Sequence, residues 1–345
     1  MPATTPRDGI AELEKRMQGA ILGQNDVIRQ MIVALLANGH VLMESLPGLA
    51  KTRAVKSLAA NLDATMRRIQ FTPDLLPSDL TGSEVLHQED GKNVFKFEPG
   101  PIFGNVILGD EINRAPAKVQ AALLEAMEER QITVAGTTHP MPPLFIVLAT
   151  QNPIEQEGTY PLPEAQMDRF LMKILITYPD PDNERGVLAL VRSEDAAAGA
   201  APVASAKTAA PAAKKDKAAA PANAPIPTDV VLGARREINA IHVSDAIGRY
   251  IVDLVNATRH PDKYGEPLSK WIQIGASPRG GISLDRASRA TAWLASRDYV
   301  TPEDVRAVAH GVLRHRLMLS YDANADGVRP DQVVDKLLEV VAVPA

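Results

Sequence analysis

The residues best suited to chemistry begin with Lys51 and Thr52, which follow a short turn containing Pro47 and Gly48. An apolar run at residues 41–43 precedes this turn, and apolar residues at helical spacing follow it. A strand, a small-residue loop, Lys-Thr and a helix make up the layout of a phosphate-binding loop, in which backbone N–H groups and a helix N-terminus face an anion. In such a loop Lys51 reaches the β- and γ-phosphates of ATP, and the Thr52 hydroxyl binds Mg²⁺.

The stretch departs from the strict pattern G-x-x-x-x-G-K-[ST] at both glycine positions, where Ser45 and Ala50 stand. Taken alone, Lys-Thr therefore fits an ordinary solvent-facing helix start equally well. The support for a nucleotide site comes from matching residues further along the chain. The expected nucleotide-binding residues of this loop are Pro47, Gly48, Leu49, Ala50, Lys51 and Thr52.

Two later strands are also expected to end in polar residues. Asp110 and Glu111 follow the apolar run 106–109, and the carboxyl ends of parallel strands are where open α/β sheets bind ligands. Asp110 would hold Mg²⁺ through water, and Glu111 would polarise the attacking water. Asn152, after the apolar run 144–149, would orient that water or bind the γ-phosphate. The alternatives are a charged strand end and a turn-forming Asn before Pro.

Two arginines stand where a helix begins or ends. Arg169 closes a short helical segment, where a cation ordinarily complements the helix dipole, but it also fits an arginine finger inserted into a neighbouring subunit's site. Arg279 follows Ser277-Pro278 in the first turn of a helix, where the dipole disfavours a cation. Its position makes sense if an anion faces it, and the alternative is a solvated arginine.

Composition excludes several classes of protein. The chain has 345 residues, 45% hydrophobic and 23% charged residues, a net charge of −5 and no cysteine. No basic excess suggests nucleic-acid binding, and neither a disulfide framework nor a thiolate metal site is possible. No apolar run approaches the length of about 18 residues that a membrane span needs. We expect a cytoplasmic protein that neither inserts into membranes nor binds nucleic acid.

The order of the elements predicts an α/β fold with a parallel sheet sandwiched by helices. Strands are expected at residues 67–71, 106–109, 131–137, 144–149 and 171–176, with helices at residues 10–18, 27–38, 116–127 and 164–170. Alternation of this kind implies right-handed crossovers between parallel strands. Asp90-Gly91, between apolar segments, predicts a β-hairpin.

Residues 193–228 are dominated by Ala and Pro with interspersed Lys, and their only large apolar side chains are Val203 and Ile226. Such a segment cannot bury a core, so it is interpreted as a flexible linker. Everything from Val230 onward is expected to be helical. The predicted division is a nucleotide-binding core at residues 1–192 with a hairpin insert at about 80–100, the linker, and an all-helical lid domain at residues 229–345.

Together these motifs resemble those of the MoxR family of AAA+ ATPases. The matching stretches, in chain order, are P-G-L-A-K-T at 47–52 (Walker A), D-E-I-N-R-A at 110–115 (Walker B), A-T-Q-N-P at 149–153 (sensor 1), L-P-E-A-Q-M-D-R-F at 162–170 (arginine finger) and G-A-S-P-R at 275–279 (sensor 2). Gly23 and Gln24, in the break between the first two helices, join the expected nucleotide-binding residues. Three features depart from the family: Ser45, Gly280-Gly281 after Arg279, and the length of the linker.

The resemblance implies an ATP-hydrolysing chaperone with ATP and Mg²⁺ as cofactors, assembled as a homo-oligomeric ring that is expected to be a hexamer. It also implies a partner that carries a von Willebrand factor A domain and a client protein that the sequence does not name. A nucleotide-gated scaffold with little hydrolysis is the alternative, because Ser45 alters the phosphate loop. A DNA-translocating motor is disfavoured by the acidic charge balance.

Overall fold

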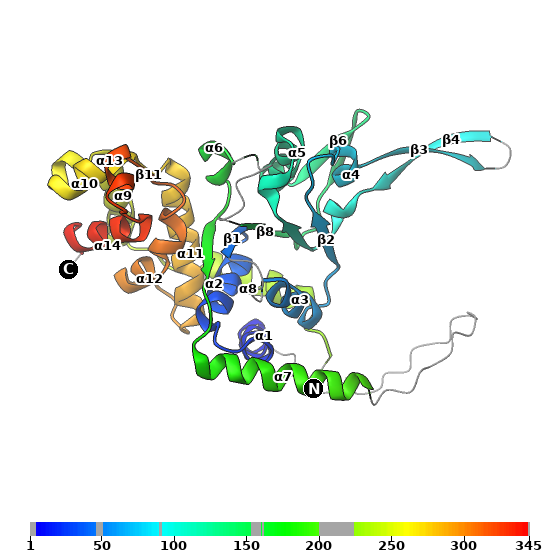
Figure 1. Ribbon diagram of the computed structural model, residues 1–345, viewed down its shortest axis with the longest axis horizontal. Coiled ribbons are helices and arrows are strands. Elements are labelled where there is room, and N and C mark those ends of the chain that lie inside the picture. The colour runs from blue at the N-terminus through cyan, green and yellow to red at the C-terminus, as the bar shows by residue number, and fades with distance from the viewer. Residues whose placement is uncertain are drawn as a thin grey trace.

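A five-stranded parallel sheet forms the centre of the molecule, and a helical domain lies at one end of it (Figure 1). The structure is a computed structural model that describes residues 5–45, 51–89, 92–152, 160, 162–199 and 224–343. The strands, in their order across the sheet, are β2 (Met66–Gln70), β5 (Val106–Asp110), β8 (Ile146–Gln151), β1 (Val41–Ser45) and β9 (Met172–Ile176). All neighbouring pairs are parallel, which confirms the predicted α/β core.

Helices cover both faces of this sheet. One face carries α1 (Pro6–Ala20), α2 (Asn25–Leu36), α3 (Lys51–Asn61) and α8 (Thr228–Asn239), and the other carries α4 (Pro77–Thr81) and α5 (Ala117–Glu129). Side chains of a strand alternate between faces, so Val41 and Met43 of β1 join the first core while Leu42 joins the second. Strands buried on both faces explain the continuous apolar runs in the sequence.

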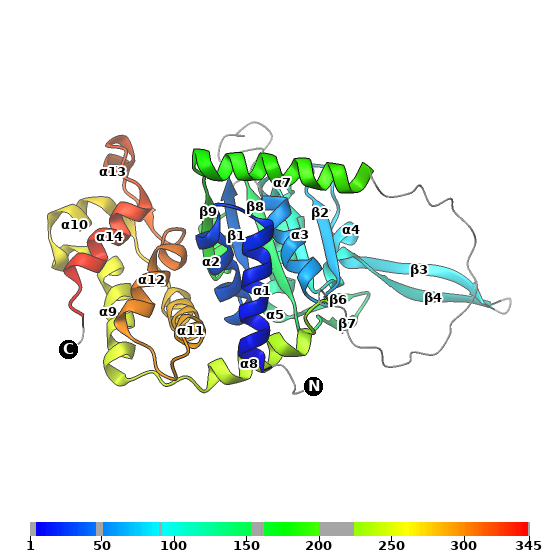
Figure 2. The same ribbon diagram turned by 90° about the horizontal axis from the view of Figure 1, so that it is seen from below.

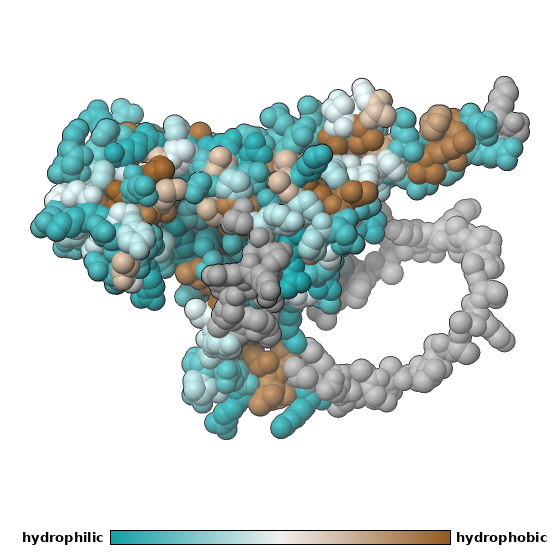
Figure 3. All heavy atoms as spheres, turned by 45° about the horizontal axis from the view of Figure 1, so that its top comes forward, coloured by the Kyte–Doolittle hydropathy of each residue, from teal (hydrophilic) through white to brown (hydrophobic). Residues whose placement is uncertain are grey.

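Two hairpins extend this core. The predicted insert is an antiparallel pair, β3 (Gly82–Glu89) and β4 (Lys92–Pro99), which projects from the body and exposes Leu86 and Phe95 (Figures 1 and 3). The strand predicted at residues 131–137 is instead a second hairpin, β6 (Gln131–Val134) and β7 (Thr137–Pro140). The backbone reverses at Ala135 and Gly136, both with positive φ, which the alternation of side chains does not reveal. The ring of Phe97 stacks on His139 and joins the two hairpins.

Short helical turns occupy the loops around the sheet. They are η1 (Pro101–Phe103), η2 (Ile112–Arg114) and α6 (Glu164–Met167). The helix predicted to reach Phe170 therefore ends three residues earlier, because the chain must turn there to enter β9. Arg169 consequently lies in the connection between α6 and β9 rather than within a helix.

The segment interpreted as a linker begins inside a helix. Helix α7 (Pro181–Gly199) runs along one side of the body and α8 lies along the opposite side (Figure 2). Residues 200–223, most of the predicted linker, lie outside the described residues. At the far end Ile226 is buried and exchanges backbone hydrogen bonds with Asn61 and Asp63, so it belongs to the core. Helix α8 packs on α1 and α2, and the division into core, linker and lid remains a prediction.

The C-terminal region is mainly helical. Its helices are α9 (Asp245–Arg259), η3 (Pro261–Tyr264), α10 (Glu266–Trp271), α11 (Pro278–Leu294), α12 (Pro302–Leu313), α13 (Tyr321–Ala325) and α14 (Pro330–Val340). The expected helix starts are confirmed, since Ser244 and Ser277 each accept a hydrogen bond from their helix's first turn and Thr301 forms a capping box with Asp304. The expectation of helix alone was wrong, because β10 (Ile272–Ile274) pairs with β11 (Met318–Leu319). Within the described ranges, no helix is long and apolar enough to cross a membrane.

Candidate functional site

The expected phosphate-binding loop lies at the carboxyl edge of the sheet. Helix α3 begins at Lys51, so Thr52 stands in its first turn, where free backbone N–H groups favour an anion. Pro47, Gly48, Leu49 and Ala50 lie outside the described residues. Ser45, the last residue of β1, is buried, and its hydroxyl has no hydrogen-bond partner in the part of the chain that the structure describes. An unpartnered polar atom next to a phosphate-loop position fits a site that completes its hydrogen bonds with a ligand.

Asp110 lies at the adjacent edge, at the end of β5. Its carboxylate is almost fully buried and accepts hydrogen bonds from Arg68 Nε at 2.8 Å and from the Thr150 hydroxyl at 3.2 Å. Asp110 and Thr150 stand on neighbouring strands and on the same face, because β5 and β8 run in parallel register. The paired carboxylate is therefore held in one orientation beside the predicted loop.

Glu111 turns out of the sheet with φ +59°, in the left-handed region that costs a non-glycine residue about 1–2 kcal/mol. Its N–H donates to the Thr150 hydroxyl at 2.9 Å. Its carboxylate accepts from Gln70 Nε2 at 3.2 Å and pairs with Arg114 Nε at 3.2 Å. Three neighbouring groups thus fix both the backbone and the carboxylate of the residue expected to act on water.

Asn152 completes this edge of the sheet. It follows β8 directly, is 4% exposed and has an interaction partner in the structure. The structure therefore brings Asp110, Glu111 and Asn152 to neighbouring strand ends, and α3 begins beyond the end of the next strand, β1. This is the juxtaposition that the ligand-binding edge of a parallel sheet requires.

The oxygen ligands available at this edge of the sheet fit Mg²⁺ bound together with a nucleotide. The Thr52 hydroxyl and the Asp110 carboxylate supply hard oxygen atoms, which Mg²⁺ prefers. Among the described residues, no group of three or more His, Cys, Asp or Glu side chains could hold a metal ion by itself. Phosphate oxygens would have to supply further ligands, as is usual for Mg²⁺ in nucleotide sites.

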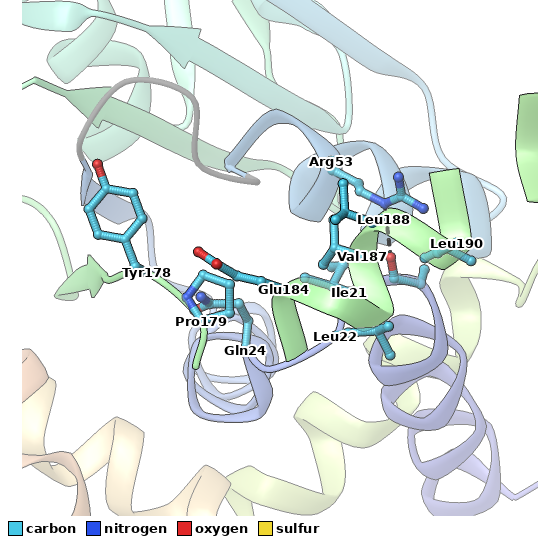
Figure 4. Close-up of a pocket in the computed structure, with 11 residues that line it drawn as sticks. Ile21, Leu22, Gln24, Arg53, Tyr178, Pro179, Glu184, Val187, Leu188 and Leu190 are labelled. Atoms are coloured by element: carbon cyan, nitrogen blue, oxygen red, sulfur yellow. Dashed lines mark hydrogen bonds between the residues drawn. The ribbon is translucent and has the colours of Figure 1, made fainter. Parts of the chain in front are cut away.

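An apolar cavity of about 380 Å³ lies beside the first turn of α3, between α7 and the junction of α1 and α2 (Figure 4). It is lined by Ala20, Ile21, Leu22, Gln24, Arg53, Tyr178, Pro179, Glu184, Val187, Leu188 and Leu190. Gln24 donates a hydrogen bond to the Thr177 carbonyl at 2.8 Å, which places its side chain between α2 and the strand that precedes α7. Gly23 has φ +73°, and a Cβ there would lie 2.7 Å from Asn183, so glycine permits the close approach of α7.

The two predicted arginines share one carboxylate, that of Glu128, whereas Glu111 pairs with Arg114. Arg169 Nε is 2.9 Å from a Glu128 carboxylate oxygen, and Arg279 pairs with the other oxygen of the same carboxylate. The sequence predicts an anion facing Arg279, and in the structure that anion is a side chain of α5. Both arginines line a cavity of about 430 Å³, the Glu128 cavity, whose other lining residues are Asn38, Gly39, His40, Met127, Arg130, Asp168, Leu171, Ile282, Ser283 and Arg286.

A buried ion pair fixes the Glu128 cavity in place. Arg316, with a side chain 1% exposed, pairs with Asp168 at 2.8 Å and donates to the carbonyls of Phe170 and Leu171. The other Asp168 oxygen accepts from the Ser277 hydroxyl at 2.7 Å. Asp168 precedes Arg169 and Ser277 caps the helix of Arg279, so these bonds set the distance between the two arginines.

Positive charge around the Glu128 cavity also affects a buried histidine. His40 accepts a hydrogen bond from the Val147 N–H at its Nδ1 atom and contacts the Met127 carbonyl through Nε2. Burial, and secondarily the charge of Arg130, lower the pKa of His40 to about 3. His40 is therefore neutral at physiological pH, and its two ring nitrogens tie β1 to β8 and α5.

Sequence reasoning missed Gln70, Thr150 and Glu128. Gln70 and Thr150 stand at strand ends. This position indicates a role at the site only when the strand order is known, because β2 and β8 lie on either side of β5. Glu128 is an ordinary helix-surface glutamate in the sequence. Its partner Arg279 is 151 residues away, so no local pattern links them.

Comparison with known proteins agrees with this geometry. A family model described as the ATPase family associated with various cellular activities (AAA) matches residues 40–172, and an AAA lid domain model matches residues 269–337. A crystal structure of a protein from Cytophaga hutchinsonii, described as a candidate ATPase, superposes with a TM-score of 0.84 at 41% identity, covering 99% of this chain and 96% of that one.

Curated relatives cover nearly the whole chain. The sequence is 44% identical to chaperone MoxR1 of Mycobacterium tuberculosis, over 94% of this chain and 79% of that protein. It is 42% identical to protein YeaC of Bacillus subtilis, over 94% and 91%, and 35% identical to protein MoxR of Paracoccus denitrificans, over 97% and 96%. The fold and the strand-end site define an AAA+ ATPase, and within that class the chain belongs to the MoxR family.

Proposed function

We propose that this protein is an ATP-hydrolysing chaperone of the MoxR type, whose catalytic base is Glu111. The observation that carries the proposal is the environment of Glu111, which is held by Gln70, Arg114 and Thr150 beside a buried Asp110. A carboxylate fixed at the carboxyl edge of a parallel sheet, next to a helix that opens with Lys-Thr, is placed to act on water attacking a terminal phosphate.

Each residue has a distinct role in this proposal. Lys51 and the backbone of residues 47–50 bind the phosphates, while Thr52 and Asp110 hold Mg²⁺, which neutralises phosphate charge when bound. Asn152 orients the attacking water. The adenine ring lies in the apolar cavity beside α3, where Gly23 allows α7 to approach and Gln24 forms part of the wall.

The arginines act between subunits of a homo-oligomeric ring, which we propose is a hexamer. Arg169 and Arg279 lie together at Glu128, and none of the residues described by the structure lines both the Glu128 cavity and the cavity beside α3. Their pairing with Glu128 rather than with the chain's own Glu111 supports the proposal that they stabilise the phosphoryl group of the next subunit's ATP.

The chaperone activity rests on the relatives rather than on the site. A relative at 44% identity is named a chaperone, which supports a role in remodelling client proteins. A partner with a von Willebrand factor A domain is proposed from the family resemblance alone. We also infer a cytoplasmic location. A pull-down with ATP-loaded Glu111→Gln as bait would identify the partner and the client, with Lys51→Ala as the matched control that should capture neither.

Two substitutions test the catalytic assignment. Lys51→Ala should lose nucleotide binding, because the phosphates lose their cation. Glu111→Gln should keep binding and lose turnover by about 10²–10⁴-fold, the usual contribution of a general base. Steady-state hydrolysis and nucleotide titration measure the two effects separately. Wild-type turnover in Glu111→Gln would exclude Glu111 as the base, and negligible turnover in the unmodified chain would favour a nucleotide-gated scaffold.

A further inference from the structure

The Glu128 cavity carries more positive than negative charge. Four arginines line it, Arg130, Arg169, Arg279 and Arg286, together with two carboxylates, Glu128 and Asp168. Asp168 is already bound by Arg316 and Ser277. Among the described lining residues, Glu128 is therefore the one carboxylate left for four guanidinium groups.

Two of these arginines have no counter-ion among the described residues. Arg130 donates only to neutral oxygen atoms, the Phe145 and Asn38 carbonyls and the Asn38 side chain. Burial, and secondarily the charge of Arg286, lower the pKa of Arg130. Arg286 itself forms neither a hydrogen bond nor an ion pair within the ranges that the structure describes. The excess charge is thus a property of several side chains around one cavity.

Glu128 occupies this cavity in the manner of a bound anion. Its two oxygens are divided between Arg169 and Arg279, which come from different parts of the fold and form no other ion pair with the residues that the structure describes. A carboxylate contributes one negative charge and two acceptor oxygens. A terminal phosphoryl group contributes more charge and three oxygens, and arginine forks bind it well. Such a group would compete effectively for the same guanidinium groups.

We propose that the Glu128 cavity is an anion site that Glu128 fills in the free chain, and that a terminal phosphoryl group presented by a second copy displaces Glu128. Arg286 then joins Arg169 and Arg279 as a further cation around the phosphoryl group. That a second copy supplies the phosphoryl group rests on the proposed ring. Glu128 holds Arg169 and Arg279 together before assembly. When two copies meet, the bonds from these arginines to Glu128 must break.

The anion site is tested first without assembly or hydrolysis. Inorganic tripolyphosphate is titrated calorimetrically into Lys51→Ala, whose own phosphate loop is disabled. Adding Glu128→Gln should tighten tripolyphosphate binding about three- to tenfold, because two partly exposed ion pairs no longer compete for Arg169 and Arg279. Adding Glu129→Gln is the matched control, because it removes the same charge from the same helix end. Adding Arg279→Ala should abolish the binding.

The source of the anion is tested next by sedimentation in a Glu111→Gln background, with ATP present. Glu128→Gln should lower the subunit concentration needed for assembly about three- to tenfold relative to Glu129→Gln. Equal tripolyphosphate binding by the Glu128 and Glu129 variants would overturn the anion site. Tighter tripolyphosphate binding without any ATP-dependent assembly would keep the site and overturn the second copy as its source, and with it the proposed ring.

Discussion

The Glu111 site and the Glu128 cavity differ in how their charges are satisfied. At the Glu111 site the Asp110 carboxylate accepts from Arg68 and Thr150, and the Glu111 carboxylate accepts from Gln70 and pairs with Arg114. One chain therefore supplies a partner to each carboxylate. Four arginines line the Glu128 cavity, and among the described residues only Arg169 and Arg279 pair with the Glu128 carboxylate. The difference indicates that the first site is built to hold a reactive group still, whereas the second retains binding capacity for an anion from outside.

The largest effect is expected from Arg169→Ala. It should bind ATP but lose about 10³-fold or more in turnover, because charge developing on the γ-phosphoryl oxygens is left unstabilised. Mixing Arg169→Ala with Lys51→Ala subunits should restore part of the activity, since some interfaces then contain one intact residue from each copy. Hydrolysis is followed as a function of mixing ratio. If subunit exchange is confirmed and hydrolysis is not recovered, Arg169 does not act on the ATP of a neighbouring subunit.

Arg316→Met should have the next largest effect, on stability. Methionine fills much of the same volume but removes the donor to one Asp168 carboxylate oxygen and to the carbonyls of Phe170 and Leu171. Breaking a buried ion pair in this way costs about 3–5 kcal/mol. Urea unfolding measures the loss, and ATP binding at the Glu111 site should persist in the folded fraction.

Arg289→Met is the control for Arg316→Met. Arg289 pairs with Asp285 one turn away on α11, where both side chains are half-buried, and a helix pair at this spacing contributes about 0.3–0.5 kcal/mol. If the two variants lose the same free energy of unfolding, the bonds of Arg316 around Asp168 do not hold the Glu128 cavity together.

Gln70→Ala should produce a smaller change confined to the Glu111 site. Loss of the amide removes one hydrogen bond that positions the Glu111 carboxylate. Turnover should fall about tenfold, equivalent to about 1.4 kcal/mol, while ATP binding and assembly stay unchanged. Gln70→Asn tests positioning, because its shorter amide should restore activity only in part. A change in assembly without a change in turnover would remove Gln70 from the site.

The last predicted effect is a pH dependence of stability from His40. Its pKa is about 3 in the folded chain and about 6.5 when unfolded, so the unfolded chain binds the additional proton. The stability that depends on neutral His40 is present above pH 6.5 and is lost as the pH falls toward 3. Between pH 7.5 and 5.5 the free energy of unfolding should fall by about 1.4 kcal/mol from this residue. His40→Gln should remove that part of the fall, and an unchanged pH dependence would contradict the pKa.

Much of the core follows from local sequence. Continuous apolar runs give strands buried on both faces, Ser244, Ser277 and Thr301 give helix starts, and the order of elements gives a parallel sheet. The second hairpin was missed because the reversal at Ala135-Gly136 leaves a weak local pattern. The extent of α7 was missed because its last residues are alanine and polar residues without large apolar side chains at helical spacing.

The sequence by itself determined which residues can act on a phosphate, because Lys51, Thr52, Asp110 and Glu111 follow strand patterns that place them at one edge of a parallel sheet. Only the tertiary structure decided what each of them contacts. Gln70 reaches Glu111 because β2 lies beside β5, and Arg169 meets Arg279 because Arg316 holds their neighbours together. Such contacts join residues up to 151 positions apart. They depend on how the elements pack against one another, and local periodicity carries no record of that packing.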